Sequence, residues 1–233
     1  MGSFDKTMKD FGVHENLQSS EEKNRLDTDG FILVPQLIES KQILAMHQSV
    51  NGVEPGEPNL QNISSAFDVL VTHPKILAGI WYLLKSPFVS SGVHYFPNMP
   101  RSGQRPLHVD YTGGPVDKQF AAHALCMVSD FTRENGATRM VPGSQWFDKS
   151  VLRNLKDRIS THPQEVLLTG TAGTVIIFNC CCWHSLTFNH TEESRIAVVS
   201  YWRQKEVQIM NRNWGTCNLG TQHRLQRAKE LFL

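Results

Sequence analysis

The sequence lacks the cysteine pattern of a disulfide-stabilised or zinc-binding domain. Its five cysteines lie at positions 126, 180, 181, 182 and 217, an odd total with three in a row and no Cys-x-x-Cys pair. Consecutive cysteines cannot build a disulfide framework with one another, and zinc sites need a different spacing. Reduced thiols inside a cell fit this pattern, so we expect a cytoplasmic protein.

Long apolar runs and an excess of one charge are also missing. No apolar run approaches the roughly 20 residues of a transmembrane helix, and residues 1–6 do not resemble the start of a signal peptide. Lys plus Arg number 23 against 22 Asp plus Glu, a net charge of +1. This balance does not favour nucleic acid or an anionic membrane as a partner. We expect a small-molecule substrate and leave a homodimer open.

The 233 residues suit one domain, in which the sequence pattern changes once from helix-forming to strand-forming. Up to about residue 87 helical signals dominate: Ser19 and Glu22 have capping-box spacing, and that helix should end at Asp29-Gly30, before a short strand over 31–34. Beyond that point come short β-branched or aromatic segments divided by turn residues. The expected strands cover 88–96, 105–111, 120–130, 165–168, 174–184 and 195–202. Helices followed by short strands predict a mainly β fold, a β-sandwich or a jelly roll, with helical buttresses, its core at about 88–205 and a tail at about 206–233.

A candidate metal site begins at His108 and Asp110. Residues i and i+2 of a strand point to the same side, so an imidazole and a carboxylate stand together. His184 would add a third ligand. Two histidines and one carboxylate leave coordination positions open, as in non-heme Fe(II) oxygenases. If 174–184 is one strand, Cys180 and Cys182 follow His184 inward, as small buried hydrophobes or as a thiol near the metal.

Arg195 opens an apolar strand and shares a face with Ala197, Val199 and Tyr201. A guanidinium that faces a protein interior is costly unless it meets an anion. A dicarboxylate cosubstrate is such an anion, and arginine binds carboxylates through paired hydrogen bonds. The alternative from this segment alone is an edge arginine in solvent.

Four segments together carry a family resemblance. They are Asp-Gly-Phe at 29–31, His-Val-Asp at 108–110, the stretch 134–145 with its Asn-Gly-Ala-Thr and Pro-Gly-Ser, and the series His184, Asn189, Arg195. In this order they resemble the phytanoyl-CoA dioxygenase-like family of Fe(II)- and 2-oxoglutarate-dependent oxygenases, over about residues 29–200. The resemblance implies a double-stranded β-helix, a cupin-like jelly roll. It also implies Fe(II), 2-oxoglutarate and O₂ as cofactor and cosubstrates.

The resemblance implies roles for individual residues. His108, Asp110 and His184 would bind iron, Arg195 would pair with the far carboxylate of 2-oxoglutarate, and Thr138 would support it. Fungal members have a glutamine three residues before the first histidine. This chain has Arg105 there and Gln104 one position earlier. Arg105 is either a second carboxylate donor or a solvent-exposed residue.

Further residues could line the pocket. Tyr95 and His94 lie on the strand before the metal motif, and one of them should face inward; we expect Tyr95 to contact the cosubstrate. Tyr111 and Thr112 directly follow the motif and could touch cosubstrate or substrate. The family's histidine after Pro-Gly-Ser is replaced by Gln145, for which we expect a structural role.

The predicted reaction is oxidation of a C–H bond in a small organic molecule, by hydroxylation or desaturation, in natural-product biosynthesis. Family members that halogenate have Gly or Ala at the position of Asp110, so its presence favours an oxygenated or desaturated product. The alternative is a cupin-like metal protein that isomerises or only binds its ligand. Such a protein has no need of a dicarboxylate anchor, so Arg195 is the residue that separates the two hypotheses.

Overall fold

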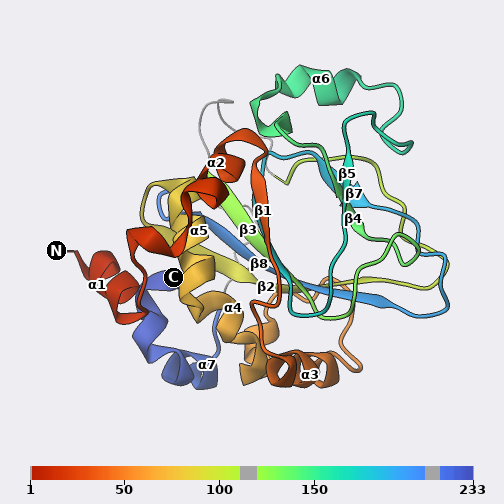
Figure 1. Ribbon diagram of the computed structural model, residues 1–233. Coiled ribbons are helices and arrows are strands. Elements are labelled where there is room, and N and C mark those ends of the chain that lie inside the picture. The colour runs from red at the N-terminus through yellow and green to blue at the C-terminus, as the bar shows by residue number, and fades with distance from the viewer. Residues whose placement is uncertain (1, 111–119, 208–215, 233) are drawn as a thin grey trace.

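Two antiparallel β-sheets face each other in the computed structural model, which describes residues 2–110, 120–207 and 216–232 (Figure 1). The strands are β1 (Phe31–Val34), β2 (Phe88–Asn98), β3 (Ala121–Met127), β4 (Thr138–Met140), β5 (Val166–Leu168), β6 (Val175–Asn179), β7 (His184–Leu186) and β8 (Arg195–Gln204). The larger sheet has the order β1-β6-β3-β8-β2, and the smaller has the order β5-β4-β7. A bridge between His108 and His184 adds the metal-motif segment to the smaller sheet beside β7.

The chain alternates between the two sheets as it advances. After β2 in the larger sheet, the segment around His108 joins the smaller one; β3 returns to the larger, β4 and β5 lie in the smaller, β6 in the larger, β7 in the smaller and β8 in the larger. This alternation is that of a jelly roll, so the predicted double-stranded β-helix is confirmed. The sheets are open at their edges and do not close into a continuous barrel.

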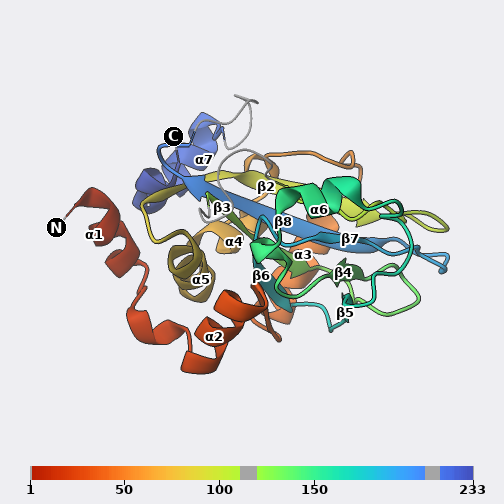
Figure 2. The ribbon, with the colours of Figure 1, turned by 90° about the horizontal axis from the view of Figure 1, so that it is seen from above.

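Helices cover the outer face of the larger sheet (Figures 1 and 2). The α-helices are α1 (Ser3–Asp10), α2 (Ser20–Thr28), α3 (Ser40–Ser49), α4 (Val69–Thr72), α5 (Pro74–Leu84), α6 (Lys149–Asn154) and α7 (Leu219–Arg224). The short 3-10 helices are η1 (Glu15–Leu17), η2 (Leu60–Asn62), η3 (Ser65–Phe67), η4 (Ser144–Trp146) and η5 (Gln226–Leu231). Helix α5 packs on β3, β6 and β8, whereas α6 lies on the side of the smaller sheet.

Local sequence signals explain where these helices begin. The Glu22 N–H donates to the Ser19 hydroxyl (3.1 Å) and the Ser19 N–H donates to the Glu22 carboxylate (2.7 Å), so the predicted capping box is formed at the start of α2. Pro74 occupies the first turn of α5, and the His73 ring caps that helix through the Lys75 N–H. Helices α1 and η5 pack together, which brings the two ends of the described chain to one side of the molecule (Figure 1).

Among the described residues, no single helix is long and apolar enough to cross a membrane. The segments Ser65–Thr72 and Pro74–Leu84, bent by 45° relative to each other, reach that length and composition only as a pair. Most side chains of the second segment, which is α5, are buried in the core beneath the helices.

The single strand expected over 174–184 is wrong, because the chain turns after Asn179. The Asn179 side chain accepts a hydrogen bond from the Cys181 N–H (2.9 Å), and its carbonyl accepts one from the Cys182 N–H (3.0 Å). Asparagine favours such local turns over the strand ladder. The turn sends β6 and β7 into different sheets, so Cys180 and Cys182 do not share a strand face with His184. Cys182 is a buried core residue whose thiol contacts Gln145 (3.4 Å).

A second apolar cluster fills the space between the sheets, separate from the core beneath the helices. The larger sheet contributes Leu125, Met127, Phe178, Ala197 and Val199, and the smaller contributes Met140 and Leu168. Strand β4, which sequence patterns did not predict, therefore supplies part of this interior. The polar side chains that face this apolar interior are therefore the candidates for binding and catalysis.

Candidate active site

The two histidines of the predicted triad are directly paired across neighbouring strands. The His108 N–H donates to the His184 carbonyl (3.1 Å) and the His184 N–H donates to the His108 carbonyl (3.0 Å). Residues that exchange both backbone hydrogen bonds in an antiparallel ladder project to the same side. The two imidazoles consequently lie with their ring centroids 4.4 Å apart.

Asp110 completes the group from the same segment as His108. Its N–H donates to the Cys180 carbonyl (3.1 Å), and its carboxylate oxygens lie 3.7 Å from His108 Nε2 and 3.4 Å from His184 Nε2. Donor atoms that share an ion at about 2.1 Å each lie within about 4 Å of one another, a range that both separations satisfy. Among the described residues these three form the one group of potential ligands whose donor atoms all lie within 4.8 Å of each other.

Backbone carbonyls orient both imidazoles in the way a metal requires. His108 Nδ1 lies 3.1 Å from the Pro106 carbonyl, and His184 Nδ1 lies 2.9 Å from the Cys182 carbonyl. A carbonyl can only accept, so each Nδ1 carries the proton and each Nε2 keeps its lone pair toward Asp110. The residues therefore fit a metal bound through two Nε2 atoms and one carboxylate.

The electrostatics of the group keep the carboxylate charged. Burial acts to raise the pKa of Asp110, but His184 and His123 face it and hold that pKa well below its usual range. Burial also acts to lower the pKa of His184, which Asp110 reverses into a net increase. Burial, followed by repulsion from His184, lowers the pKa of His108. Metal binding needs the charged carboxylate, and the raised pKa of His184 means that a proton on its imidazole would be released when a metal binds.

Arg195 and Thr138 are buried with polar atoms that no partner satisfies. The Arg195 side chain is 1% exposed, and none of its three guanidinium nitrogens has a hydrogen-bond partner among the described residues. Its guanidinium lies over the Phe131 ring, 4.3 Å from the centroid. Thr138, on β4 opposite Leu168 of the interior cluster, also has an unpaired buried hydroxyl. Burial of a lone guanidinium favours an anionic ligand, which a carboxylate of 2-oxoglutarate would provide.

A pair of asparagines braces the strand ends near Arg195. Asn98 lies opposite Arg195 in the ladder, and its amide donates to the carbonyls of Gly136 (3.1 Å) and Thr187 (3.0 Å). The Asn189 amide in turn donates to the Asn98 carbonyl (3.0 Å). Gly136 has a φ of +80°, and a Cβ there would lie 2.0 Å from the Asn98 amide nitrogen. The Asn-Gly and Asn189 elements of the family pattern are thus explained by packing around Arg195 rather than by chemistry.

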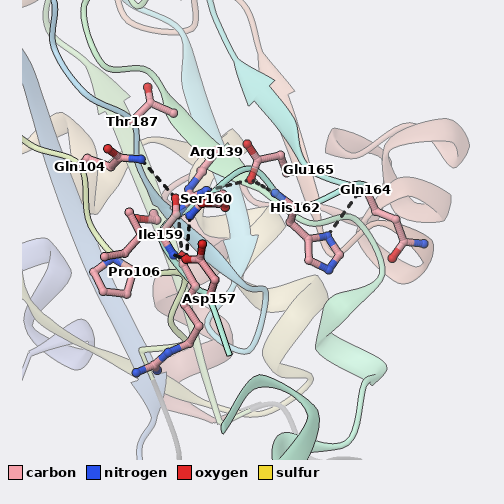
Figure 3. Close-up of polar contacts among 12 residues, drawn as sticks. Gln104, Pro106, Arg139, Asp157, Ile159, Ser160, His162, Gln164, Glu165 and Thr187 are labelled. Carbon is pink, nitrogen blue, oxygen red and sulfur yellow. Dashed lines mark hydrogen bonds and ion pairs between the residues drawn. The ribbon is translucent and has the colours of Figure 1, made fainter. Parts of the chain in front are cut away.

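The outer face of β4 carries a different buried arginine. Arg139 donates to the Ser160 carbonyl (2.9 Å) and to Glu165 (3.0 Å) through one terminal nitrogen, and to the carbonyls of Arg105 (3.1 Å) and Arg158 (2.8 Å) through the other. Figure 3 shows this network, with the loop around Asp157 to Glu165 folded against it. Its contact with Arg105 ties that loop to the segment that carries the metal motif.

Several predicted contacts lie elsewhere. The Arg105 side chain is exposed, and Gln104 donates to the Ile159 carbonyl (3.2 Å), away from the triad (Figure 3). Tyr95 requires a correction: it is opposite Val198 and belongs to the core beneath the helices, while His94 is opposite Val199 of the interior cluster. Strand alternation allowed one of the two to face inward, and it is His94. Tyr111 and Thr112 fall outside the described residues.

Sequence reasoning did not identify His123, an interior residue next to the triad. His123 on β3 has its Nε2 3.3 Å from Asp110, and its ring contacts Tyr201 (4.3 Å between centroids). Tyr201 also contacts His94 (4.5 Å). The signal that could have revealed His123 is a polar residue on the inward face of an otherwise apolar strand, Ala-Ala-His-Ala-Leu-Cys-Met.

Comparisons with known proteins agree with this geometry. The model of the family described as phytanoyl-CoA dioxygenase (PhyH) matches residues 54–197. The dioxygenase trt7 of Aspergillus terreus (strain NIH 2624 / FGSC A1156) is 34% identical over 86 residues, which are 35% of this chain and 26% of that protein. The match to this relative therefore spans only about a quarter of its length.

Solved structures share the fold. HygX from Streptomyces hygroscopicus, solved with nickel and 2-oxoglutarate bound, superposes with a TM-score of 0.68 at 18% identity, over 82% of this chain and 88% of HygX. SnoN, an α-ketoglutarate-dependent epimerase from nogalamycin biosynthesis, gives 0.63 at 20% identity, over 79% and 81% of the chains. The family match covers more than half of the 233 residues and includes the triad and Arg195. The chain therefore belongs to the phytanoyl-CoA dioxygenase family, whose members use Fe(II), 2-oxoglutarate and O₂.

Proposed function

We propose that this dioxygenase-family protein hydroxylates or desaturates a C–H bond of a small organic molecule. His108, Asp110 and His184 would hold Fe(II), and Arg195 with Thr138 would hold the far carboxylate of 2-oxoglutarate. Bound iron and cosubstrate supply the oxidation, which no protein side chain can perform on an unactivated C–H bond. The observation that carries the proposal is the buried Arg195 guanidinium, which has no hydrogen-bond partner in the described part of the chain and faces the same interior as the triad.

The roles of the protein's own groups follow from their contacts. The Pro106 and Cys182 carbonyls hold the two imidazoles in the tautomer that exposes Nε2. Arg195 would fix the direction in which the cosubstrate lies, because a guanidinium pairs with a carboxylate through two parallel hydrogen bonds. The apolar cluster around it, including Leu125, Met127 and Ala197, would keep water away from the cosubstrate chain. This arrangement gives 2-oxoglutarate a single orientation.

Natural-product biosynthesis is the setting we propose. HygX has been solved with hygromycin B bound, and SnoK is a carbocyclase from nogalamycin biosynthesis. These proteins have 16% and 18% identity to this chain, so they support a fold used for such chemistry and do not identify the substrate. Asp110 supports oxygenation or desaturation over halogenation, because it fills the position that a halide would need.

The decisive experiment adds Fe(II) and then 2-oxoglutarate without oxygen and follows the weak visible charge-transfer band of the chelated cosubstrate. We expect the band with the wild-type chain and none with His108→Ala, which removes one of three ligands. Circular dichroism should show that the variant remains folded, because His108 is half-exposed at the end of the interior (44% of the side chain). A band of equal strength in both proteins would exclude His108 from the site.

The reaction class has its own measurement. With a candidate substrate, ¹⁸O₂ and excess chloride, we expect one succinate for each oxygenated or desaturated product molecule, and no chlorinated product. A chlorinated product, or turnover without succinate, would contradict the role assigned to Asp110. An isomerised product of unchanged mass would favour the alternative in which the jelly roll isomerises its ligand.

A further inference from the structure

A third histidine lies beside the triad on the opposite sheet. His123 is 3% exposed, and its Nε2 is 3.3 Å from an Asp110 oxygen. The pair is within ion-pair distance but is not aligned as a hydrogen bond, and neither ring nitrogen has another hydrogen-bond partner among the described residues. A buried polar group without a partner is unfavourable, because it has lost its hydrogen bonds to water. An imidazole at this position therefore needs an explanation beyond filling space.

The surroundings of His123 hold its ring in place. Strand β3 is central in the larger sheet, where His123 lies opposite Phe178 of β6 and Tyr201 of β8. Its ring is edge-on to Phe178 at 5.2 Å and tilted against Tyr201 at 4.3 Å. An imidazole packed between two aromatic rings on a central strand keeps its Nε2 within reach of Asp110, and a small rotation of either side chain would align the pair as a hydrogen bond.

His123 is not one of the clustered ligands. The group whose donor atoms all lie within 4.8 Å of each other contains His108, Asp110 and His184, and His123 is outside it although it is close to Asp110. A carboxylate that binds a metal through one oxygen has a second oxygen available for a hydrogen bond. Such outer partners orient the ligand and typically change metal affinity by about 10- to 100-fold when they are removed.

We propose that His123 is a positioning residue that donates a hydrogen bond from Nε2 to Asp110 Oδ2, which also lies 3.4 Å from His184 Nε2, and so leaves Oδ1, which faces His108, to bind iron. This inference rests on the proposed function, because it assigns Asp110 as an iron ligand. The hydrogen bond makes Asp110 a one-oxygen ligand of fixed direction and leaves the remaining coordination positions to cosubstrate and oxygen. The larger sheet thereby contributes to a metal site whose three ligands all come from the side of the smaller sheet.

The test measures Fe(II) affinity of the full chain without oxygen, by competition with a chromophoric chelator. His123→Phe keeps a ring between Phe178 and Tyr201 but removes the donor, and we expect about 10- to 100-fold weaker binding. His123→Gln restores a donor at similar reach and should recover most of the affinity. The control is His73→Asn, since His73 lies on the helical side of the larger sheet, where it caps α5 through the Lys75 N–H (3.2 Å), and asparagine keeps a capping acceptor. It should bind Fe(II) as the wild type does.

Two results would overturn the inference. One is wild-type affinity in His123→Phe, or no recovery in His123→Gln; thermal unfolding of the metal-free variants separates this from a loss of folding. The other is pulsed EPR of the Cu(II)-loaded wild type showing three coordinated imidazoles, which would make His123 a ligand; we expect two. If the wild type binds no Fe(II), the proposed function fails as well. If the wild type binds Fe(II), His108→Ala does not, and His123→Phe matches the wild type, the positioning role alone fails.

Discussion

Two arginines, Arg139 on the outer face of β4 and Arg195 on the inner face of β8, are equally buried at 1% exposure. They differ in the hydrogen bonds that their terminal nitrogens make. The terminal nitrogens of Arg139 make four hydrogen bonds, and only its Nε is unpaired. Arg195 has an aromatic ring beneath it and no hydrogen-bond partner among the described residues. A buried arginine whose terminal nitrogens are hydrogen-bonded by protein groups stabilises the fold. A buried arginine whose donors lack protein acceptors is available to bind a ligand.

The difference has an electrostatic consequence. Burial lowers the pKa of Arg195 to about 9, because the guanidinium is removed from water. An anion in the interior would raise this pKa again and offset the cost of burying the charge. The fold therefore tolerates an unfavourable residue at one point, as expected for a binding group.

The largest effect we expect is on stability and comes from the saturated arginine. Arg139→Met should lower the free energy of unfolding by about 3–5 kcal/mol, because it leaves Glu165 buried without its partner and frees three carbonyls. Urea unfolding of the metal-free protein measures it. The double variant Arg139→Met, Glu165→Gln should recover part of the loss, since no unpaired charge remains. A loss below about 1 kcal/mol would show that the network in Figure 3 contributes little.

The next effect is on ligand binding and comes from the unsaturated arginine. Arg195→Met should weaken 2-oxoglutarate binding to the metal-loaded protein by about 10- to 100-fold, since a charge-assisted contact contributes about 1.5–3 kcal/mol. Its ligand-free stability should equal or exceed that of the wild type, because a buried unpaired charge is removed. Isothermal titration and urea unfolding measure the two quantities. Unchanged 2-oxoglutarate binding would remove Arg195 from the site, and a stability loss like that of Arg139→Met would erase the contrast between the arginines.

The smallest effect sharpens the same contrast at Thr138. Thr138→Val replaces a buried hydroxyl that has no partner with a methyl group of similar shape. We expect little change in stability and about two- to tenfold weaker 2-oxoglutarate binding, equivalent to about 0.5–1.5 kcal/mol for one neutral hydrogen bond. Thr138→Ser keeps the hydroxyl and should bind 2-oxoglutarate nearly as the wild type does. Equal binding by the Val and Ser variants would mean that the hydroxyl does not reach the cosubstrate.

Local periodicity predicted a mainly β fold and the face that Arg195 shares with Ala197 and Val199, and the family resemblance selected the jelly roll over a β-sandwich. It also placed His108 beside Asp110, although the strand expected over 105–111 is not formed among the described residues and His108 makes only an isolated bridge to His184. What it could not provide is the partner of each strand. His123 approaches Asp110 only because β3 faces the smaller sheet, a relation between segments that no spacing along the chain encodes.

The errors have the same origin. Alternation leaves open which of His94 and Tyr95 faces the interior until the pairing of β2 with β8 is known. The continuous apolar run before His184 concealed a turn, because the Asn179 side chain that makes it is compatible with a strand until the next residues are placed. Strand β4 is short and lies among glycines, prolines and turn residues, so no local pattern predicted it. It is recognised as a strand only by its pairing with β5 and β7.

The ladder contact between His108 and His184 makes metal binding a property of strand alignment. Two backbone hydrogen bonds fix these residues opposite each other. A slip of one residue would turn His108 and Asp110 to the opposite face together, since side chains alternate with a period of two. A chain that folds with the slipped alignment would have normal strand content and no affinity for iron. Fe(II) present during refolding would bind only the correctly aligned chains and would therefore increase their share of the population.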